Sequence, residues 1–294
     1  MGKYKEINHQ DIELKLGCDL AKYSTIKLSA KGNMAIVKSE DAIVYLIPLL
    51  KKKSLTFQIV GWGSNQVLTG EIDLYIKLEL PQNREELKSL KDVYQLNAST
   101  SILSMVTTAK KLGLVGWDVL TGIPASLGGA ICMNAGTSLG DIAPLVESVR
   151  VLTPDGKIIE KNLNTSDFQY RRNLFLETDE IILSAKIRHL GTDENLAEKI
   201  NNYLDKRNQT QPLKTKNCGS VFKNNKPFIA GKIIDTCGLK GFGLENIHVS
   251  FMHANFIEHT GNGRAKEFKN MTDALIEEIE RFSGQKFELE VKIV

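Results

Sequence analysis

Gly61-Trp62-Gly63-Ser64-Asn65 follows directly on the apolar run 57–60, which has the composition of a short buried strand. Two glycines after a strand let the backbone turn tightly and bring its N–H groups close to an anion. Ser64 and Asn65 can add side-chain donors. Gln66 stands where a Rossmann fingerprint has its third glycine, and the sequence has no Walker-type phosphate loop. The stretch is therefore either a plain strand-ending turn or a phosphate cradle of another fold.

The apolar pattern around this turn predicts a mixture of strands and helices. Strands are expected at 34–37, 57–60, 74–78, 93–96, 146–153, 157–160, 181–189, 255–257 and 287–293, and helices at 102–112, at 194–206 and over the apolar positions 42–50 and 271–282. Gly113 is a plausible C-cap, and Pro154-Asp155-Gly156 is a hairpin turn. The sequence predicts an α+β chain in roughly three lobes, with a first boundary in the polar stretch 81–91.

Length and composition are those of a globular protein. The 294 residues are 42% hydrophobic and 25% charged, with a net charge of +3 and no basic stripe that would mark a nucleic-acid surface. Four cysteines without paired metal spacing are typical of reduced thiols, and neither a signal peptide nor a membrane span is apparent. We expect a cytoplasmic protein that binds no metal, no nucleic acid and no membrane, and for which no obligatory protein partner is apparent.

A second glycine-rich segment follows the helix expected at 102–112. It reads Thr121-Gly122-Ile123-Pro124-Ala125-Ser126-Leu127-Gly128-Gly129 and continues into Asn134-Ala135-Gly136. So many glycines are incompatible with a regular helix or strand, and ordering such a loop costs conformational entropy. Ordered loops of this kind usually line a site, so a binding role is favoured over a purely structural one.

Three further stretches carry side chains suited to chemistry. Gln169-Tyr170-Arg171-Arg172-Asn173 offers an arginine to a carboxylate or phosphate. Asn217-Cys218-Gly219-Ser220-Val221-Phe222-Lys223-Asn224 holds Ser220 in a glycine turn that lacks the pattern of a nucleophile elbow, and Cys218 is interpreted as structural. In the strand expected at 287–293, Glu288 and Glu290 share a face, so their repulsion favours a proton on one of them; a solvent-facing edge strand is the plainer interpretation.

Taken together and in this order, the five segments resemble the UDP-N-acetylenolpyruvoylglucosamine reductase family, flavoenzymes that complete the muramic-acid precursor of peptidoglycan. The resemblance runs from about Tyr23 to the C-terminus. It implies an FAD-binding module of the vanillyl-alcohol-oxidase type in two lobes, followed by a C-terminal α+β substrate-binding lobe. The corresponding domains are 1–80, with the C-terminal strand nearby, 81–191 and 192–294.

The resemblance also implies a role for each matching residue. The implied FAD contacts are Gly61, Trp62, Gly63, Ser64 and Asn65 in the diphosphate turn, Thr121, Gly122, Ile123, Pro124, Ser126, Gly128 and Gly129 in the second loop, and Arg207 ahead of Pro212. The implied substrate contacts are Tyr170, Lys223 and Asn224. The implied catalytic residues are Arg171, Ser220 and Glu290.

The chemistry of the family explains these residue types. Its co-substrate NADPH gives a hydride to FAD, from which the hydride passes to the enolpyruvyl double bond of a UDP-sugar. Arg171 and a protonated Glu290 are suited to stabilise the resulting enolate. Ser220 is the implied donor of the proton that the neighbouring carbon needs.

Some positions depart from the family pattern. Trp62 stands where the family has the middle of three glycines, and a positive φ there would strain it. Asn173 replaces a common serine, and Ala30 replaces a glycine. The short interval between Tyr170 and the strand expected at 181–189 leaves no room for the tyrosine-bearing loop of one subclass, so the chain resembles the subclass that lacks it.

Other functions stay open at this point. The first is a different FAD-dependent oxidoreductase of the same fold that acts on a sugar or an alcohol. The second is a non-catalytic FAD-binding relative. A hydrolase that uses Cys218 or Ser220 comes last.

Overall fold

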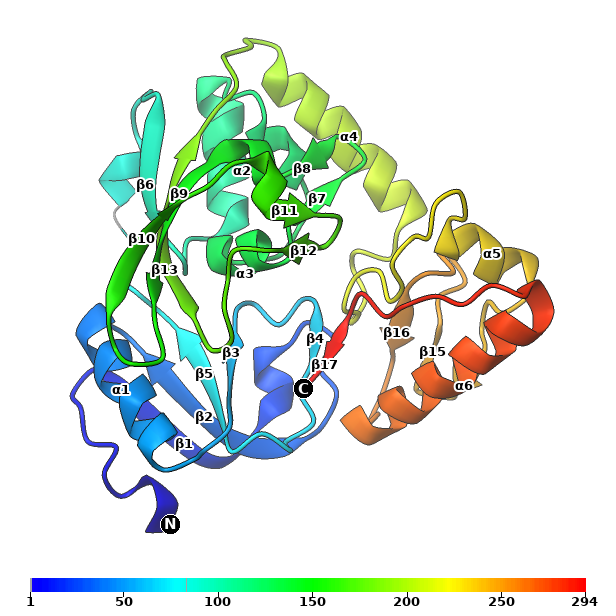
Figure 1. Cartoon of the computed structure of the whole chain (residues 1–294). Helices are drawn as coiled ribbons and strands as arrows, with labels where there is room; N and C mark the ends of the chain where they lie inside the picture. The colour runs from blue at the N-terminus through cyan, green and yellow to red at the C-terminus, as the bar shows by residue number, and fades with distance from the viewer. Residues whose placement is uncertain (1, 83) are drawn as a thin grey trace. The chain divides into compact units, whose positions relative to one another are not determined.

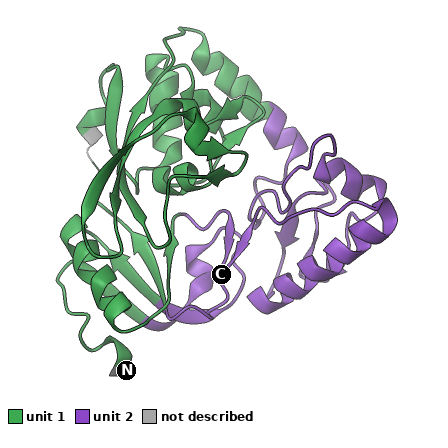
Figure 2. Ribbon diagram, in the orientation of Figure 1, with its two compact units in different colours: residues 1–15, 34–61, 74–205 green, residues 16–33, 62–73, 206–294 purple. Residues whose placement is uncertain are grey.

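The computed structural model describes residues 2–82 and 84–294, which form two compact units. Unit 1 comprises residues 1–15, 34–61 and 74–205, and unit 2 comprises residues 16–33, 62–73 and 206–294 (Figure 2). The chain passes repeatedly from one unit to the other, so each unit is assembled from segments that are distant in the sequence (Figure 1).

The first sheet carries the strand that ends in the glycine turn. Its strand order is β1-β2-β5-β3, and β5 pairs in parallel with both β2 and β3. Helix α1 supplies the crossover that parallel strands need. The bounds are Ile12–Asp19 for β1, Lys31–Val37 for β2, Glu40–Lys52 for α1, Phe57–Val60 for β3 and Leu74–Leu78 for β5. Apolar side chains from α1 and from these strands share one core, which explains the continuous apolar runs in the sequence.

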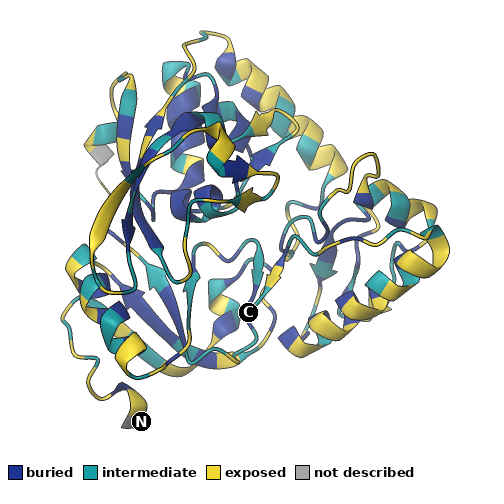
Figure 3. Ribbon diagram, viewed as in Figure 1, coloured by how far each residue is buried: buried dark blue, intermediate teal, exposed yellow. Residues whose placement is uncertain are grey.

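The second sheet lies in unit 1 and is antiparallel, in the order β10-β9-β13-β6. The hairpin expected around Pro154 is present, with Ile158 opposite Leu152. The bounds are Val93–Asn97 for β6, Ile102–Leu112 for α2, Leu127–Cys132 for α3, Val146–Leu152 for β9, Ile158–Asn162 for β10 and Ile181–Arg188 for β13. Helices α2 and α3 join the sheet in one apolar cluster around the fully buried Trp117. Strand β10 is the exposed edge (Figure 3).

Unit 2 is organised around the long helix α6 and the three-stranded sheet β14-β15-β16. The buried face of α6 belongs to the same apolar cluster as Val221 and Phe222, the residues after Ser220. A separate parallel pair joins β4 to β17, with Gln66 opposite Lys292. The bounds are Gln66–Val67 for β4, Ala230–Thr236 for α5, Gly243–Leu244 for β14, Ile247–Val249 for β15, Ile257–His259 for β16, Ala265–Ser283 for α6 and Lys292–Ile293 for β17.

The remaining elements are α4 and several short segments. Helix α4 spans Leu196–Thr210. The short strands are Gly136–Thr137 (β7), Gly140–Asp141 (β8), Phe168–Gln169 (β11) and Arg172–Asn173 (β12). Single 3₁₀ turns occupy Gly2–Tyr4, Leu20–Tyr23, Arg84–Leu87, Trp117–Leu120, Ala143–Leu145 and Thr165–Asp167. Within residues 2–82 and 84–294, no helix has the length and apolar character to cross a bilayer.

The α+β class and most expected elements are confirmed. Helix 102–112 is α2, and Gly113 caps it with a φ of 72°. The division into lobes at 1–80, 81–191 and 192–294 stays a prediction.

Two expected strands are wrong in their extent. The strand expected at 255–257 begins only at Ile257. At Asn255 it is the side chain, and not the backbone of a strand, that bonds the N–H and the carbonyl of Phe222, at 2.9 Å each. The strand expected at 287–293 is regular only at its end. Leu289 forms an antiparallel bridge with Phe222, whereas β17 pairs in parallel with β4, so the segment changes partner between Leu289 and Lys292.

Two phenylalanines on α6 allow a test of where this helix packs. Phe268 is fully buried, whereas Phe282 is 57% exposed. We expect Phe268→Ala to destabilise the protein by about 3–5 kcal/mol, because it leaves a cavity in the core of unit 2. The matched Phe282→Ala should cost less than about 1 kcal/mol. Denaturant unfolding monitored by circular dichroism measures both, and equal losses would contradict this packing of α6.

Candidate active site

The turn after β3 is shaped by Gly63. Its φ is 64°, and a Cβ built on it would lie 2.1 Å from the Tyr23 carbonyl oxygen. The left-handed conformation and the close approach of the neighbouring backbone therefore both require glycine. Among the described residues with positive φ, this turn contributes Gly63 and not Trp62, so the strain considered for Trp62 does not arise. The Trp62 side chain is 42% exposed.

Asn65 connects this turn to the end of the chain. Its side-chain amide donates to the Glu290 carbonyl oxygen at 3.0 Å, and its own carbonyl accepts from the Lys292 N–H at 3.0 Å. The parallel pairing of β4 with β17 continues directly from this contact. The last residue of the glycine turn thus holds the backbone of Glu290.

Ser220 and Glu290 lie on adjacent backbone segments. The Glu290 N–H donates to the carbonyl oxygen of Val221, the residue after Ser220, at 2.7 Å. Ser220 itself forms an antiparallel bridge with Phe256, so the serine is held between two segments. Gly219 precedes it with a φ of 75°, and a Cβ there would lie 3.8 Å from the Ser64 carbonyl oxygen. Unit 2 therefore brings the glycine turn, Ser220 and Glu290 together.

The expected repulsion between Glu288 and Glu290 loses its basis in the structure. The two residues were expected to share a face of one continuous strand, and that strand is interrupted. The Glu288 carboxylate instead forms an ion pair with the Lys223 ammonium at 3.0 Å. Glu288 thus has a cationic partner of its own.

The second glycine-rich loop is anchored on the segment between β6 and α2. The N–H groups of Leu127 and Gly128 each donate at 2.8 Å, to the carbonyl oxygens of Thr100 and Ala98. A Cβ on Gly128 would lie 2.9 Å from the Ala98 Cβ, so glycine allows this contact. Ser126 caps α3 by accepting from the Gly129 N–H at 3.4 Å.

The first residue of the glycine turn meets this loop within unit 1. A Cβ on Gly61 would lie 2.7 Å from the Ser126 hydroxyl oxygen. The end of β3 and the start of α3 are therefore in direct contact, and only the absence of a side chain on Gly61 permits it.

Arg171 has an unusual backbone and fixed partners. Its φ is 56°, in a region that non-glycine residues rarely adopt. Its guanidinium donates to the carbonyl oxygens of Asn134 and Gly136 at 3.4 and 3.1 Å, and it lies 5.1 Å from the centroid of the Tyr170 ring. Such strain persists only where the surrounding structure enforces it, and it concentrates at functional sites.

Asn134 and Asn255 hold the backbone beside predicted site residues, a role that the sequence predictions do not include. Asn134 has a φ of 41° and is buried, and its amide group bonds the Gln169 carbonyl oxygen at 3.0 Å and the Ala143 N–H at 3.2 Å. Asn255 clamps the backbone next to Ser220. The sequence places Asn134 in the segment 134–136 and Asn255 in the strand expected at 255–257, but neither hydrogen-bonding role is visible without the partner.

Three further predicted residues, Arg207, Asn224 and Tyr170, lie on the surface or near it. The Arg207 guanidinium donates from Nε and Nη2 to the Gln211 amide oxygen, at 3.0 and 2.8 Å, within one turn at the end of α4. Asn224 accepts from the Ala230 N–H at 3.0 Å and so stands at the start of α5. Tyr170 is 52% exposed.

The predicted residues thus form one group in each unit. Unit 1 holds Gly61, the loop 121–129, Tyr170 and Arg171. Unit 2 holds the turn 62–65, Arg207, Ser220, Lys223, Asn224 and Glu290.

The two glycine segments fit a dinucleotide such as FAD. At Gly61, Gly63 and Gly128 a Cβ would meet neighbouring protein atoms, so only glycine lets the backbone of these two segments pack as closely as it does. Backbone N–H groups are suitable partners for a diphosphate. Among the described residues, no three His, Cys, Asp or Glu side chains are grouped as metal ligands would be.

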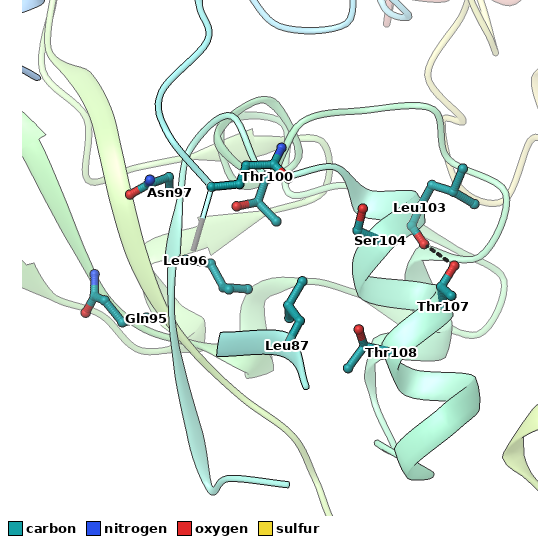
Figure 4. Close-up of a pocket in the computed structure, with 10 residues that line it drawn as sticks. Leu87, Gln95, Leu96, Asn97, Thr100, Leu103, Ser104, Thr107 and Thr108 are labelled. Atoms are coloured by element: carbon teal, nitrogen blue, oxygen red, sulfur yellow. Dashed lines mark hydrogen bonds between the residues drawn. The ribbon is translucent and has the colours of Figure 1, made fainter. Parts of the chain in front are cut away.

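A pocket of about 450 Å³ lies elsewhere, between β6 and α2 (Figure 4). All ten residues that line it are uncharged, and they include Gln95, Asn97, Ser104 and Thr107. None of them belongs to the groups described above. A ligand that carries a diphosphate would find neither a cation nor a glycine turn in this pocket, so it is not the candidate site.

Comparisons with family models cover most of the chain. Residues 33–162 match the model of an FAD binding domain, and residues 211–294 match the C-terminal domain of UDP-N-acetylenolpyruvoylglucosamine reductase.

Relatives of that name align over nearly the whole chain. The reductase of Halalkalibacterium halodurans is 28% identical over 96% of this chain and 94% of its own length. The reductase of Streptococcus pyogenes serotype M12 is 29% identical over 96% of both chains.

A solved structure is similar as well. The crystal structure of the UDP-N-acetylenolpyruvylglucosamine reductase from Thermus caldophilus superposes with a TM-score of 0.78 at 26% identity, over 96% of this chain and 98% of that one. With both family models matched in order and the fold shared over 96% of its length, this chain belongs to the UDP-N-acetylenolpyruvoylglucosamine reductase family.

Proposed function

We propose that this chain catalyses the NADPH-dependent reduction of the enolpyruvyl group of UDP-N-acetylglucosamine enolpyruvate to UDP-N-acetylmuramate, with FAD as cofactor. The observation that carries the proposal is the hydrogen-bonded connection from Asn65 through Glu290 to Val221, because it joins the flavin turn to Ser220 and Glu290. The product is a precursor of peptidoglycan, and through it the enzyme serves cell-wall synthesis, cell shape and division. We place the reaction in the cytoplasm, in keeping with four cysteines that are free thiols.

FAD, when bound, supplies the hydride chemistry, accepting a hydride from the reduced nicotinamide and delivering it to a substrate carbon. The chain's own residues bind it through backbone. Gly61, Gly63 and Gly122 present N–H groups to the diphosphate, and Arg207 adds a cation. In this role Arg207 exchanges the neutral Gln211 oxygen for a phosphate oxygen, which is a stronger acceptor for a guanidinium.

Ser220, Arg171 and Glu290 act on the substrate in this proposal. The Ser220 hydroxyl gives its proton to the substrate carbon next to the one that receives the hydride. Arg171, held by the carbonyls of Asn134 and Gly136, stabilises the negative charge that spreads into the substrate carboxylate. Glu290 adds a hydrogen bond to the same enolate when its carboxyl group carries a proton.

The UDP-sugar meets Tyr170, Lys223 and Asn224. Lys223 is paired with Glu288, whose side chain is 81% exposed. An exposed ion pair stabilises the protein little, so the ammonium can exchange this carboxylate for a phosphate of the nucleotide at little cost.

The hydrolase alternative conflicts with the environment of Cys218. The thiol is fully buried, and this burial raises the pKa of Cys218 to about 12. A thiolate nucleophile is therefore not formed near neutral pH.

The proposed reaction is tested in its two halves. The purified protein should carry FAD, NADPH should reduce the flavin without oxygen, and the enolpyruvyl sugar nucleotide should then reoxidise it. Ser220→Ala should leave reduction by NADPH unchanged and slow reoxidation by about 10²- to 10⁴-fold, because only that half needs the proton. Stopped-flow absorbance measures both rates. A reduced flavin that responds to oxygen and not to the substrate would instead favour another oxidoreductase of this fold.

The glycine turn is tested with two matched substitutions. Gly63 and Gly284 have φ values of 64° and 67°, but a Cβ on Gly284 meets no atom within 4 Å. Both Gly→Ala changes carry the strain of a left-handed residue, about 1–2 kcal/mol.

Gly63→Ala alone also drives a methyl group into the Tyr23 carbonyl. We expect it to weaken FAD binding by at least about tenfold, or about 1.4 kcal/mol. Titration of the deflavinated protein with FAD measures this, and Gly284→Ala should bind FAD normally. Equal affinities would contradict the assigned turn.

The protonation of Cys218 is tested with a thiol reagent. At pH 8 the native protein should react at no more than three of its four cysteines, because the pKa of Cys218 lies near 12 and its sulfur is enclosed. All four should react after denaturation. Mass spectrometry counts the modified thiols. Rapid labelling of Cys218 in the native protein would instead support Cys218 as a nucleophile.

A further inference from the structure

The segment 23–26 of unit 2 runs between the glycine turn and the loop that leads to Ser220. Thr25 lies at its centre and bonds to both. Its N–H donates to the Gly63 carbonyl oxygen at 3.1 Å, and its hydroxyl donates to the Asn217 carbonyl oxygen at 2.6 Å. The hydroxyl oxygen is also 3.4 Å from the Gly63 oxygen, but its single proton serves the shorter contact.

The bond to Gly63 sets the direction of the next peptide group. In a planar trans peptide the C=O and N–H groups point in opposite directions. Because the Gly63 carbonyl points at Thr25, the N–H of Ser64 points away from it. That is the orientation that a backbone donor to an anion requires at this turn.

The bond to Asn217 fixes the approach to Ser220. The Asn217 side chain accepts from the Gly219 N–H at 3.0 Å and donates to the Pro212 carbonyl oxygen at 2.7 Å. Its main-chain carbonyl is the group that Thr25 holds. The side chain and the main chain of Asn217 are therefore both bonded. These bonds fix the backbone two residues before Gly219, and so set the direction from which the chain reaches Ser220.

The residue after Thr25 is anchored as well. His259 is buried, its Nε2 accepts from the Gly263 N–H at 2.8 Å, and its Nδ1 is 2.8 Å from the Ile26 carbonyl oxygen. Because Nε2 is the acceptor, Nδ1 carries the proton and donates to Ile26. The backbone that carries Thr25 is therefore anchored at the next residue, Ile26.

We propose that Thr25 is a positioning residue, which sets the flavin turn and the Ser220 loop in a fixed relation through one N–H and one hydroxyl. The inference rests on the proposed function, since it concerns FAD at the turn and the proton donor Ser220. Thr25 makes no contact with a reacting atom in this role. It acts through Gly63 on the cofactor and through Asn217 on the serine.

The test uses variants of the full-length protein. Thr25→Val keeps the shape of the side chain and removes the hydroxyl, and Thr25→Ser restores it. The matched control is Thr69→Val, because the Thr69 hydroxyl also donates to a main-chain oxygen in unit 2, that of Val294 at 3.0 Å, away from the Ser220 loop. Thr25→Ala is a second variant without the hydroxyl.

Three measurements separate positioning from simple stabilisation. Thr25→Val keeps the N–H that bonds Gly63 and loses only the hydroxyl that bonds Asn217, so it should leave the Kd of FAD within about twofold of the parent. It should slow reoxidation by the enolpyruvyl substrate at least about tenfold more than reduction by NADPH, because only reoxidation uses Ser220. Thr25→Ser should return the rate of reoxidation to within about twofold of the parent, whereas Thr69→Val should change neither the Kd nor the two rates. The melting temperature of each variant is recorded beside them.

Other outcomes overturn the inference. Thr25→Val could behave like Thr69→Val, or lose melting temperature while the ratio of the two rates stays the same. Failure of both Thr25→Val and Thr25→Ala to fold, with Thr69→Val folded, would make the hydroxyl a folding determinant and not a positioning group. A parent protein that binds no FAD would refute the proposed function itself, which is a different result from an active parent with an indifferent Thr25→Val.

Discussion

The backbone hydrogen bond from Glu290 to the Val221 carbonyl oxygen holds the end of the chain against the segment that carries Ser220. Asn65 bonds the Glu290 carbonyl from the other side, and the parallel pairing of β4 with β17 continues the contact. Buried backbone groups must find partners, so this arrangement cannot loosen at one point without leaving donors or acceptors unpaired. The glycine turn, the serine and the carboxylate are consequently parts of one hydrogen-bonded assembly in unit 2.

Unit 1 reaches its own fixed geometry by different means. The second glycine loop rests on the segment between β6 and α2 through backbone bonds, and Gly61 and Gly128 allow contacts that a side chain would prevent. Arg171 and Asn134 both adopt positive φ and bond to each other's segment. Two strained residues that stabilise one another place a cation at a defined position, as the charge-stabilising role proposed for Arg171 requires.

Local sequence predicted local structure well where one principle dominated. The helix 102–112 was predicted to the residue because apolar spacing, polar ends and Gly113 agree. The strands 57–60 and 74–78 were predicted because both are mostly apolar runs, as is typical of strands in a parallel sheet. The length of the strand expected at 287–293 was overestimated, because its apolar pattern gives no sign that the segment changes partner between Leu289 and Lys292. Asn255 was missed as a clamp because its partner Phe222 is distant in the sequence.

The sequence by itself determined the α+β class, the order of the segments and the residue types that could hold a dinucleotide. These are local properties, since glycine in a turn or an apolar run in a strand has the same meaning wherever the chain goes. Only the tertiary structure decided that Gly63, and not Trp62, takes the left-handed conformation, because the backbone of Tyr23 lies against it. It also decided that Asn65, Ser220 and Glu290 meet, because hydrogen bonds between distant segments depend on where the whole chain folds.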